Sequence, residues 1–240
     1  MNIARPDLAP PRLSARQAAE FQQQLRGLVI ATAKPISPRF IAGVDVSYDF
    51  VPSRFTRRPR ASETVYAAVV VLELPSLRVV ETASITDRAR FPYVPGLLSF
   101  REIPPLLKAF RKLRRAPDAV LVDGQGVAHP RRCGLASHLG LVLDLPTVGC
   151  AKSRLVGDYR EPGRARGSWS DLRDGGEVIG RVLRTRDGVA PLFVSVGHKI
   201  SLDAATALVL ECAPRYRLPE TTRQAHWLVN QLRGKERLCA

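Results

Sequence analysis

The nine residues FIAGVDVSY at positions 40–48 show the pattern of a buried β-strand with one carboxylate in its middle. Alternation along a strand places Val44 and Val46 on one face and Gly43 and Asp45 on the other. A carboxylate inside such a strand costs roughly several kcal/mol unless it is paired or bound to a metal. The ordinary alternative is a solvent-facing aspartate near the strand's end, and this stretch alone leaves both interpretations open.

The segments around this strand predict an α/β fold with a mixed sheet. Residues 65–74 and 78–86 are two further strands, joined by a tight turn at Pro75 and Ser76, and with 40–48 they form an antiparallel meander. The later strands are expected at 119–122, 147–151 and 192–196. The helices are expected at 14–28, 97–114, 135–143, 201–212 and 219–232. This order indicates a single domain, residues 1–240, with helices on both faces of the sheet.

Some details of these elements can be predicted as well. Ser14 and Gln17 form a capping box that opens the first helix. Two consecutive prolines, Pro104 and Pro105, predict a kink or break in the helix 97–114. Gly234 is expected to end the last helix. Residues 154–186 are rich in glycine and charge and are expected to form an irregular excursion or a small hairpin.

Composition indicates a globular protein and favours, without establishing, a polyphosphate partner. The 240 residues carry a net charge of +15 and are 45% hydrophobic, and no apolar run approaches the roughly 20 residues of a membrane span. We therefore expect a cytoplasmic protein without a membrane partner. The basic excess favours nucleic acid, although most of it is arginine, a bias that genome composition alone can produce. The four cysteines are scattered, which is typical of buried thiols rather than disulfides or a zinc site.

A second carboxylate closes a strand, because Asp123 follows Val122 directly. If the strands 40–48 and 119–122 are adjacent and parallel, Asp45 and Asp123 meet at the sheet edge where α/β proteins bind ligands. Two facing carboxylates repel each other, and a divalent cation relieves that repulsion. Mg²⁺ held by such a pair and by substrate phosphate is the usual arrangement for phosphoryl transfer. The pair therefore predicts a Mg²⁺ site.

Three further polar residues are candidates for the same site. Glu102 lies on the helix after the meander, Lys152 follows the strand 147–151, and His198 follows the strand 192–196. Each of them, taken alone, is more often a structural or solvent-facing side chain. Polar groups gathered at three strand ends would instead indicate a functional site.

The hexapeptide FPYVPG, residues 91–96, is a stiff aromatic loop bracketed by prolines. Such a loop loses little entropy when it inserts between bases, so it is a candidate wedge that separates or stacks on bases. A simple turn into the following helix is the alternative.

Taken together, these segments resemble the endonuclease V family of deoxyinosine-directed repair nucleases. The matching pieces span most of the chain in the family's order: IAGVDVSY (41–48), FPYVPGLLSFREIP (91–104), VDGQGVAHPRRCGLASHLG (122–140), PTVGCAKSRL (146–155) and VSVGHKISLDAA (194–205). The resemblance implies a ribonuclease-H-like fold and hydrolysis of a nucleic-acid strand that depends on Mg²⁺, for which Mn²⁺ can substitute. It further implies that a monomer cuts DNA at the second phosphodiester bond 3′ to deoxyinosine, leaving 3′-hydroxyl and 5′-phosphate ends.

The resemblance also implies roles for individual residues. It assigns metal binding to Asp45, Glu102, Asp123 and His198. Its other catalytic positions are Lys152, near the scissile phosphate, and His129. The family's strand-separating wedge corresponds to Pro92, Tyr93, Val94 and Pro95. The pocket for the flipped hypoxanthine corresponds to Gly96, Leu98, Gly124 and Gly134. Hypoxanthine pairs weakly, so flipping it costs less than flipping a matched base.

Two alternatives to this function remain open. The chain could cut inosine-containing RNA on the same scaffold, which only contacts to the 2′-hydroxyl would reveal. It could also bind the lesion without cutting, although a protein that only binds would be free to lose Asp45, Glu102 and Asp123, and all three are present. Arginines that are candidates for contacts to the nucleic-acid backbone are Arg111, Arg114, Arg115, Arg131 and Arg132. Neither 154–186 nor the arginine-rich loop 54–60 receives a functional assignment.

Overall fold

The computed structural model describes residues 1–31, 35–49 and 64–239. Within these residues the strands form one mixed sheet of eight strands in the order β3-β2-β1-β4-β5-β8-β7-β6. β4 and β5 run parallel to β1, and every other neighbouring pair is antiparallel. The strands are β1 (Phe40–Tyr48), β2 (Thr64–Glu73), β3 (Arg78–Arg88), β4 (Ala119–Val122), β5 (Thr147–Ala151), β6 (Trp169–Asp174), β7 (Glu177–Leu183) and β8 (Leu192–His198).

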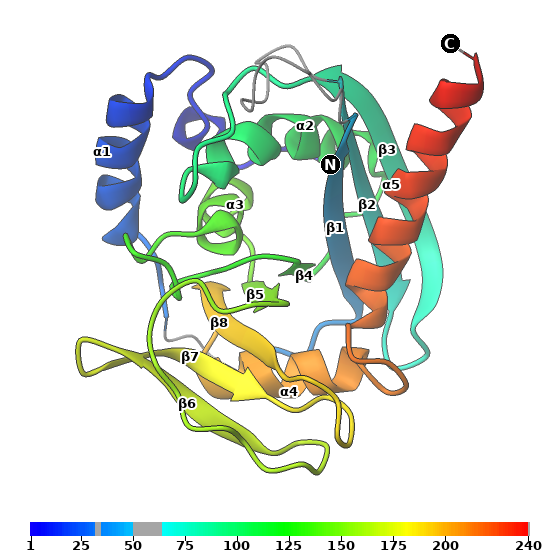
Figure 1. Cartoon of the computed structure of the whole chain (residues 1–240). Coiled ribbons are helices and arrows are strands. Elements are labelled where there is room, and N and C mark those ends of the chain that lie inside the picture. The colour runs from blue at the N-terminus through cyan, green and yellow to red at the C-terminus, as the bar shows by residue number, and fades with distance from the viewer. Residues whose placement is uncertain (32–34, 50–63, 240) are drawn as a thin grey trace.

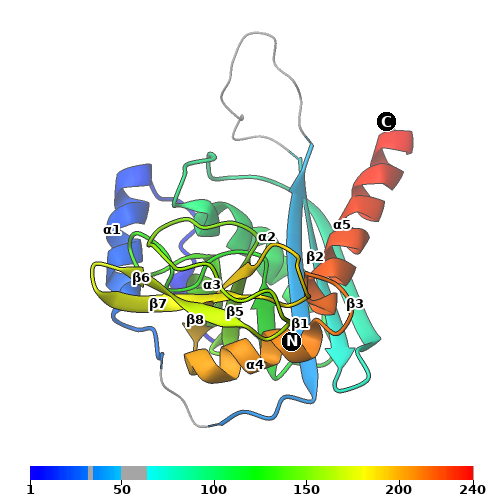
Figure 2. The ribbon, with the colours of Figure 1, turned by 60° about the horizontal axis from the view of Figure 1, so that its bottom comes forward.

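Helices cover both faces of the sheet (Figure 1). One face carries α2 (Leu98–Lys112) and α3 (Leu135–Leu143), and the other carries α4 (Leu202–Cys212) and α5 (Glu220–Cys239). α1 (Ala15–Arg26) and a short 3₁₀ helix (Pro6–Leu8) pack outside α3. In both whole-chain views α1 and α5 lie on opposite sides of the molecule (Figure 2). The expected mixed sheet between two layers of helices is confirmed.

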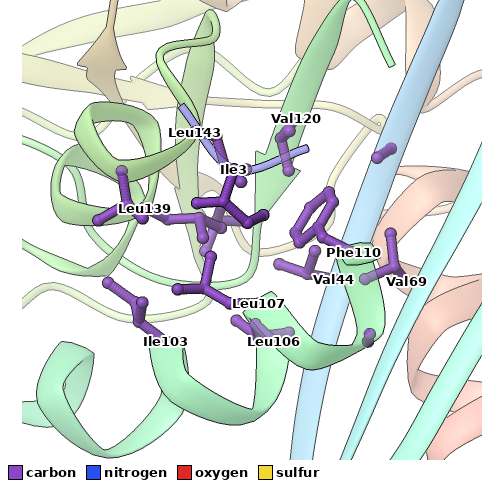
Figure 3. Close-up of a cluster of buried hydrophobic side chains, with 14 of the residues drawn as sticks. Ile3, Val44, Val69, Ile103, Leu106, Leu107, Phe110, Val120, Leu139 and Leu143 are labelled. Carbon is purple, nitrogen blue, oxygen red and sulfur yellow. The ribbon is translucent and has the colours of Figure 1, made fainter. Parts of the chain in front are cut away.

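The larger core lies between the sheet and α2 and α3. Figure 3 shows Val44, Val69 and Val120 of the sheet facing apolar side chains of α2 and α3, with Ile3 inserted among them. The helical members labelled there are Ile103, Leu106, Leu107, Phe110, Leu139 and Leu143. Since each fully buried side chain of this size contributes about 1.5–3 kcal/mol, this contact fixes α2 on the meander.

Two helices differ from what their prolines and glycine led us to expect. α2 runs through Pro104 and Pro105 without the break that was one of the two expected outcomes, because burial of its apolar face offsets the hydrogen bonds that the prolines remove. α5 continues past Gly234 to Cys239, since one glycine costs a helix only about 1 kcal/mol.

The segment 154–186 contains a regular hairpin. β6 and β7 pair within it and extend the sheet through β8, which agrees with the second of the two alternatives expected for this segment. The arginine-rich loop 54–60 lies outside the described residues. Cys133, Cys150 and Cys212 are free, buried thiols. Among the described helices, none combines the length and the apolar character that crossing a membrane requires.

The helix α5 approaches β1 unusually closely. A Cβ atom at Gly43 would lie 2.1 Å from the carbonyl oxygen of Thr221, a distance that no side chain tolerates. Gly43 therefore lets the first turn of α5 rest directly on the strand. Because side chains alternate, the face that α5 covers is also the face of Asp45.

His138 joins three elements in the other helical layer. Its Nε2 donates to the carbonyl oxygen of Leu8 at 2.7 Å, and its Nδ1 accepts from the hydroxyl of Ser99 at 3.0 Å. Burial lowers the pKa of His138 to about 4. The ring is therefore neutral in the folded protein near pH 7, and it ties α3 to the N-terminal segment and to α2.

We predict that this histidine makes stability depend on acidity. The unfolded chain protonates a histidine near pH 6.5, whereas the folded protein does so only near pH 4, so the unfolded state binds more protons between these values. Stability is therefore lost as the pH falls. From pH 7 to pH 5 the free energy of unfolding should drop by about 2 kcal/mol more in the wild-type protein than in His138→Gln. Urea unfolding at both pH values measures this, and equal drops in the two proteins would contradict it.

Candidate functional site

Asp45 and Asp123 meet at the edge of the sheet where β1 and β4 end. The two strands are parallel, and Val44 lies opposite Val122, so the aspartates are the next residues on neighbouring strands. Burial raises the pKa of Asp45, and the charge of Asp123 raises it further, against an opposing effect of His226. The prediction that the two strands are adjacent and parallel is confirmed.

Glu102 reaches the same edge from α2, on the opposite face of the sheet. Its side chain is buried, and Tyr48 donates a hydrogen bond to its Oε1 at 3.2 Å. Burial raises the pKa of Glu102 to about 8, and the charges of Asp45 and Asp123 contribute to that rise. The three carboxylates therefore lie close enough to repel one another, and two layers of the fold supply them.

His226 on α5 completes this group, and sequence analysis did not identify it. Its Nδ1 lies 2.8 Å from Asp45 Oδ2, and Asn230 Nδ2 lies 2.9 Å from its Nε2. Nδ1 therefore carries the proton that bonds Asp45, while Nε2 accepts from the amide. Two signals in the sequence could have found it: the four-residue spacing of His226 and Asn230 on a helix, and Gly43 on the same strand face as Asp45.

His198 lies elsewhere, which corrects the prediction that it completes the metal site. It ends β8, but β8 runs antiparallel to β5, so His198 pairs with Thr147, the first residue of β5. That places it at the opposite edge of the sheet. There its Nδ1 accepts from the backbone N–H of Ile30 at 3.3 Å, and its Nε2 lies 3.8 Å from a carboxylate oxygen of Asp144. The end of a strand in the sequence does not reveal the strand's direction.

Lys152 lies beside the aspartates, directly after β5. Its ammonium group forms an ion pair with Asp123. Arg217, from the connection between α4 and α5, donates to the backbone carbonyl of Lys152 at 2.8 Å and to that of Pro191 at 2.9 Å. The lysine is therefore anchored through its backbone, while its side chain remains partly exposed.

A pocket of about 430 Å³ opens beside this charged group. Asp123 and Lys152 form part of its wall. The other site residues predicted from the sequence that line it are Tyr93, Val94, Pro95, Gly96, Leu98, Gly124, His129 and Gly134. Pro92 is not in the lining, and Tyr93 is 54% exposed at the surface. The loop 92–95 and the predicted base pocket thus share one cavity with two of the charged residues.

The physical reason for a glycine differs among the glycines that line this pocket. A Cβ atom at Gly134 would lie 2.3 Å from the carbonyl oxygen of Gln125, so packing requires glycine there. Gly96 has a φ of +77°, which side-chain-bearing residues rarely adopt. At Gly124 a Cβ would meet only Leu135 and Val122, at 3.5 Å or more. Packing therefore does not require the glycine at position 124.

His129 is engaged at both ring nitrogens. Its Nδ1 accepts from the backbone N–H of Arg131, and its Nε2 donates to the carbonyl oxygen of Gly96, each at 3.1 Å. Burial and the charge of Arg131 lower the pKa of His129 to about 4. The ring is therefore neutral near pH 7 and is bonded to the backbone at Gly96 and Arg131, while its expected catalytic role stays a prediction.

The carboxylates fit a hard divalent cation. Among the described side chains, no three histidine, cysteine or acidic groups are close enough to hold a metal in their present arrangement. Each carboxylate instead has a hydrogen-bond or ion-pair partner: His226 for Asp45, Lys152 for Asp123 and Tyr48 for Glu102. Carboxylate oxygens, buried on Glu102 and partly buried on Asp45 and Asp123, are the ligand type that Mg²⁺ and Ca²⁺ prefer.

Comparison with known proteins identifies close relatives. Residues 23–227 match the family model described as Endonuclease V. Endonuclease V of Gloeobacter violaceus is 51% identical over 225 residues, covering 92% of this chain and 87% of the relative. Endonuclease V of Roseiflexus sp. (strain RS-1) is 48% identical over 217 residues, covering 90% and 92%.

Solved structures agree with these sequence relatives. The crystal structure of endonuclease V from Streptomyces avermitilis has a TM-score of 0.86 and 44% identity, and the match covers 97% of each chain. A point variant of Ciona intestinalis endonuclease V was solved with a 23mer DNA containing an inosine followed by a ribo-adenosine. It has a TM-score of 0.78 and 29% identity, with 93% of this chain and 99% of that chain covered.

We predict that Glu102 lowers stability as the pH rises. The folded protein keeps a proton on Glu102 up to about pH 8, whereas the unfolded chain releases it near pH 4.3. The folded state therefore binds more protons in between, and stability is lost across this interval as the pH rises. Urea unfolding in EDTA at pH 5.5 and 8 should show a larger loss in the wild-type protein than in Glu102→Gln. A parallel pH dependence in both proteins would contradict the assignment.

Proposed function

Because this chain belongs to the endonuclease V family, we propose that it is a Mg²⁺-dependent repair endonuclease acting on DNA that contains deoxyinosine. It would cut the second phosphodiester bond 3′ to the lesion and leave 3′-hydroxyl and 5′-phosphate ends. The observation that carries the proposal is the pair Asp45 and Asp123 at neighbouring parallel strand ends, beside a pocket that opens next to a loop with an exposed tyrosine. The Ciona intestinalis relative solved with inosine-containing DNA supports the choice of substrate.

We assign metal binding to Asp45 and Asp123, with Glu102 nearby as the third acidic group. When bound, Mg²⁺ supplies the positive charge that stabilises the transition state of phosphodiester hydrolysis. It also offsets the repulsion that raises the pKa values of Asp45 and Glu102. Lys152 pairs with Oδ2 of Asp123, so Oδ1 of that carboxylate would be available to the metal.

The chain's own residues have distinct roles in this proposal. Lys152, beside Asp123, supplies a positive charge to the scissile phosphate. His226 donates to Asp45 Oδ2 and keeps that carboxylate oriented. Tyr48 does the same for Glu102. These donors hold the carboxylates in place before substrate arrives.

The pocket fits the recognition of a flipped base. Its volume of about 430 Å³ lies within the range of roughly 300–1,000 Å³ that is usual for ligand pockets. Gly124 lies in the wall beside Asp123, and because packing does not require a glycine there, we assign its small size to admitting the base. Tyr93 at the tip of the loop 92–95 is exposed and free to stack on a neighbouring base. Weak pairing of hypoxanthine lowers the free energy needed to bring it into the pocket.

Incubation with Mg²⁺ and an end-labelled duplex carrying one deoxyinosine tests the reaction. We expect a single nick at the second phosphodiester bond 3′ to the lesion, abolished by EDTA. Asp45→Ala and Asp123→Ala should each lower the rate by about a hundredfold or more, because each removes a carboxylate assigned to holding Mg²⁺, whose positive charge stabilises the transition state. Tight binding without a nick would contradict catalysis. Cleavage of a matched inosine RNA but not of the DNA would contradict the substrate, and the ribo-adenosine in the Ciona intestinalis complex makes RNA a necessary arm.

A pair of histidine variants tests the corrected site. His226→Ala removes the donor to Asp45 and should lower kcat by about tenfold or more, as expected for loss of a hydrogen bond to a charged group. His198→Ala removes a ring at the opposite sheet edge and should change kcat by less than about twofold. Circular dichroism at the assay temperature verifies that both variants are folded. A larger effect of His198→Ala than of His226→Ala would contradict the assignment.

A further inference from the structure

The loop 92–95 is supported by the N-terminal helix. Val94 packs against a buried apolar cluster that α1 and α2 share with the residues flanking the loop. The buried members of the cluster are Ala18, Phe91, Leu97 and Phe100. At the start of the loop, Arg101 donates to the carbonyl oxygen of Phe91. The tip of the loop is exposed, but its two ends are fixed.

A polar chain holds the far end of the loop. The carbonyl oxygen of Gly96 accepts from Arg131 Nη2 at 2.8 Å and from His129 Nε2 at 3.1 Å. The guanidinium of Arg131 also donates, through Nε, to the amide oxygen of Gln22 on α1. The amide nitrogen of Gln22 in turn donates to the carbonyl oxygen of Cys133. Gln22 therefore connects α1 to Gly96 through one arginine.

The burial of Gln22 is specific. Positions 22, 23 and 24 are all glutamine, yet only the side chain of Gln22 is buried, at 1% exposure, while Gln23 and Gln24 are exposed. A buried amide is destabilising unless it is hydrogen-bonded, and both ends of this amide are. Gln22 also lines the pocket beside Gly96. Gln22 therefore contacts the pocket directly and the loop 92–95 indirectly, through Arg131 and Gly96.

We propose that Gln22 is a positioning residue that, through Arg131, holds the loop 92–95 rigid enough to separate a base pair. The inference rests on the proposed function. A loop inserted into a duplex must resist the restacking of the bases that it parts. A loop that is fixed at both ends has less conformational entropy to lose on insertion than a mobile one, so its insertion is more favourable. Without Gln22, Arg131 loses this bond to α1, and its own bond to the carbonyl oxygen of Gly96 is no longer anchored to that helix.

Two substrates separate this role from a general structural one. The same deoxyinosine strand is presented either paired with its complement, where the loop must part the strands, or alone, where it need not. Gln22→Met preserves the volume of the side chain and removes its hydrogen bonds. Gln23→Met, one residue along the same helix, is the matched control.

We expect Gln22→Met to lower kcat/KM on the duplex by about tenfold, the effect of one hydrogen bond to a charged group. On the single strand the loss should be less than about twofold, and Gln23→Met should match the wild-type protein on both substrates. Equal losses on the two substrates, or no loss on the duplex, would overturn the proposal. Failure of the wild-type protein to cut either substrate would instead overturn the proposed function.

A binding measurement in EDTA tests the inference without cleavage. The duplex carries 2-aminopurine in the complementary strand, next to the base opposite the inosine, so that its fluorescence rises when the strands part. The wild-type protein at saturating concentration should raise the fluorescence, and Gln22→Met should raise it by less than half as much. No rise with the wild-type protein, or the same rise with both proteins, would overturn the proposal.

Discussion

The contact between α5 and β1 at Gly43 is the constraint on which the charged site depends. Because Gly43 has no side chain, the carbonyl oxygen of Thr221 can rest directly against the strand, and α5 lies close enough for His226 to bond Asp45. Further along, Arg233 bonds Ser47 on the same strand face. A larger residue at position 43 would lift the helix from the strand. The glycine therefore sets the height of the histidine over the carboxylate.

The two faces of the sheet supply different parts of the site. The face covered by α5 holds Asp45 and its histidine. The face covered by α2 and α3 supplies Glu102, and the walls of the pocket come from the loops around those helices. Only at the ends of the parallel strands do both sets of side chains come together. Burial and the neighbouring charges raise the pKa values of Asp45 and Glu102 there, so ionising these groups lowers the stability of the folded protein.

Local pattern predicted most elements of the fold, because alternation, capping and proline–glycine signals act within a few residues. The pairing of Asp45 with Asp123 also followed, since it needed only two adjacent parallel strands. The direction of β8 could not be predicted, and that error misplaced His198. The same limit concealed His226 and Gln22, whose partners lie 181 residues away for His226 and as many as 111 away for Gln22. Such contacts are set by how whole layers pack.

The separation of Asp45 and His226 along the chain has a consequence for how the protein is made. A ribosome releases the strand that carries Asp45 long before it releases α5, because the two bonded residues are 181 positions apart. Until α5 docks, Gly43 is uncovered, and Asp45 lacks both its hydrogen bond to His226 and the helix that covers its face of the strand. The charged group around Asp45 is therefore completed only after α5 has been made and has docked, however early the strands of the sheet have formed.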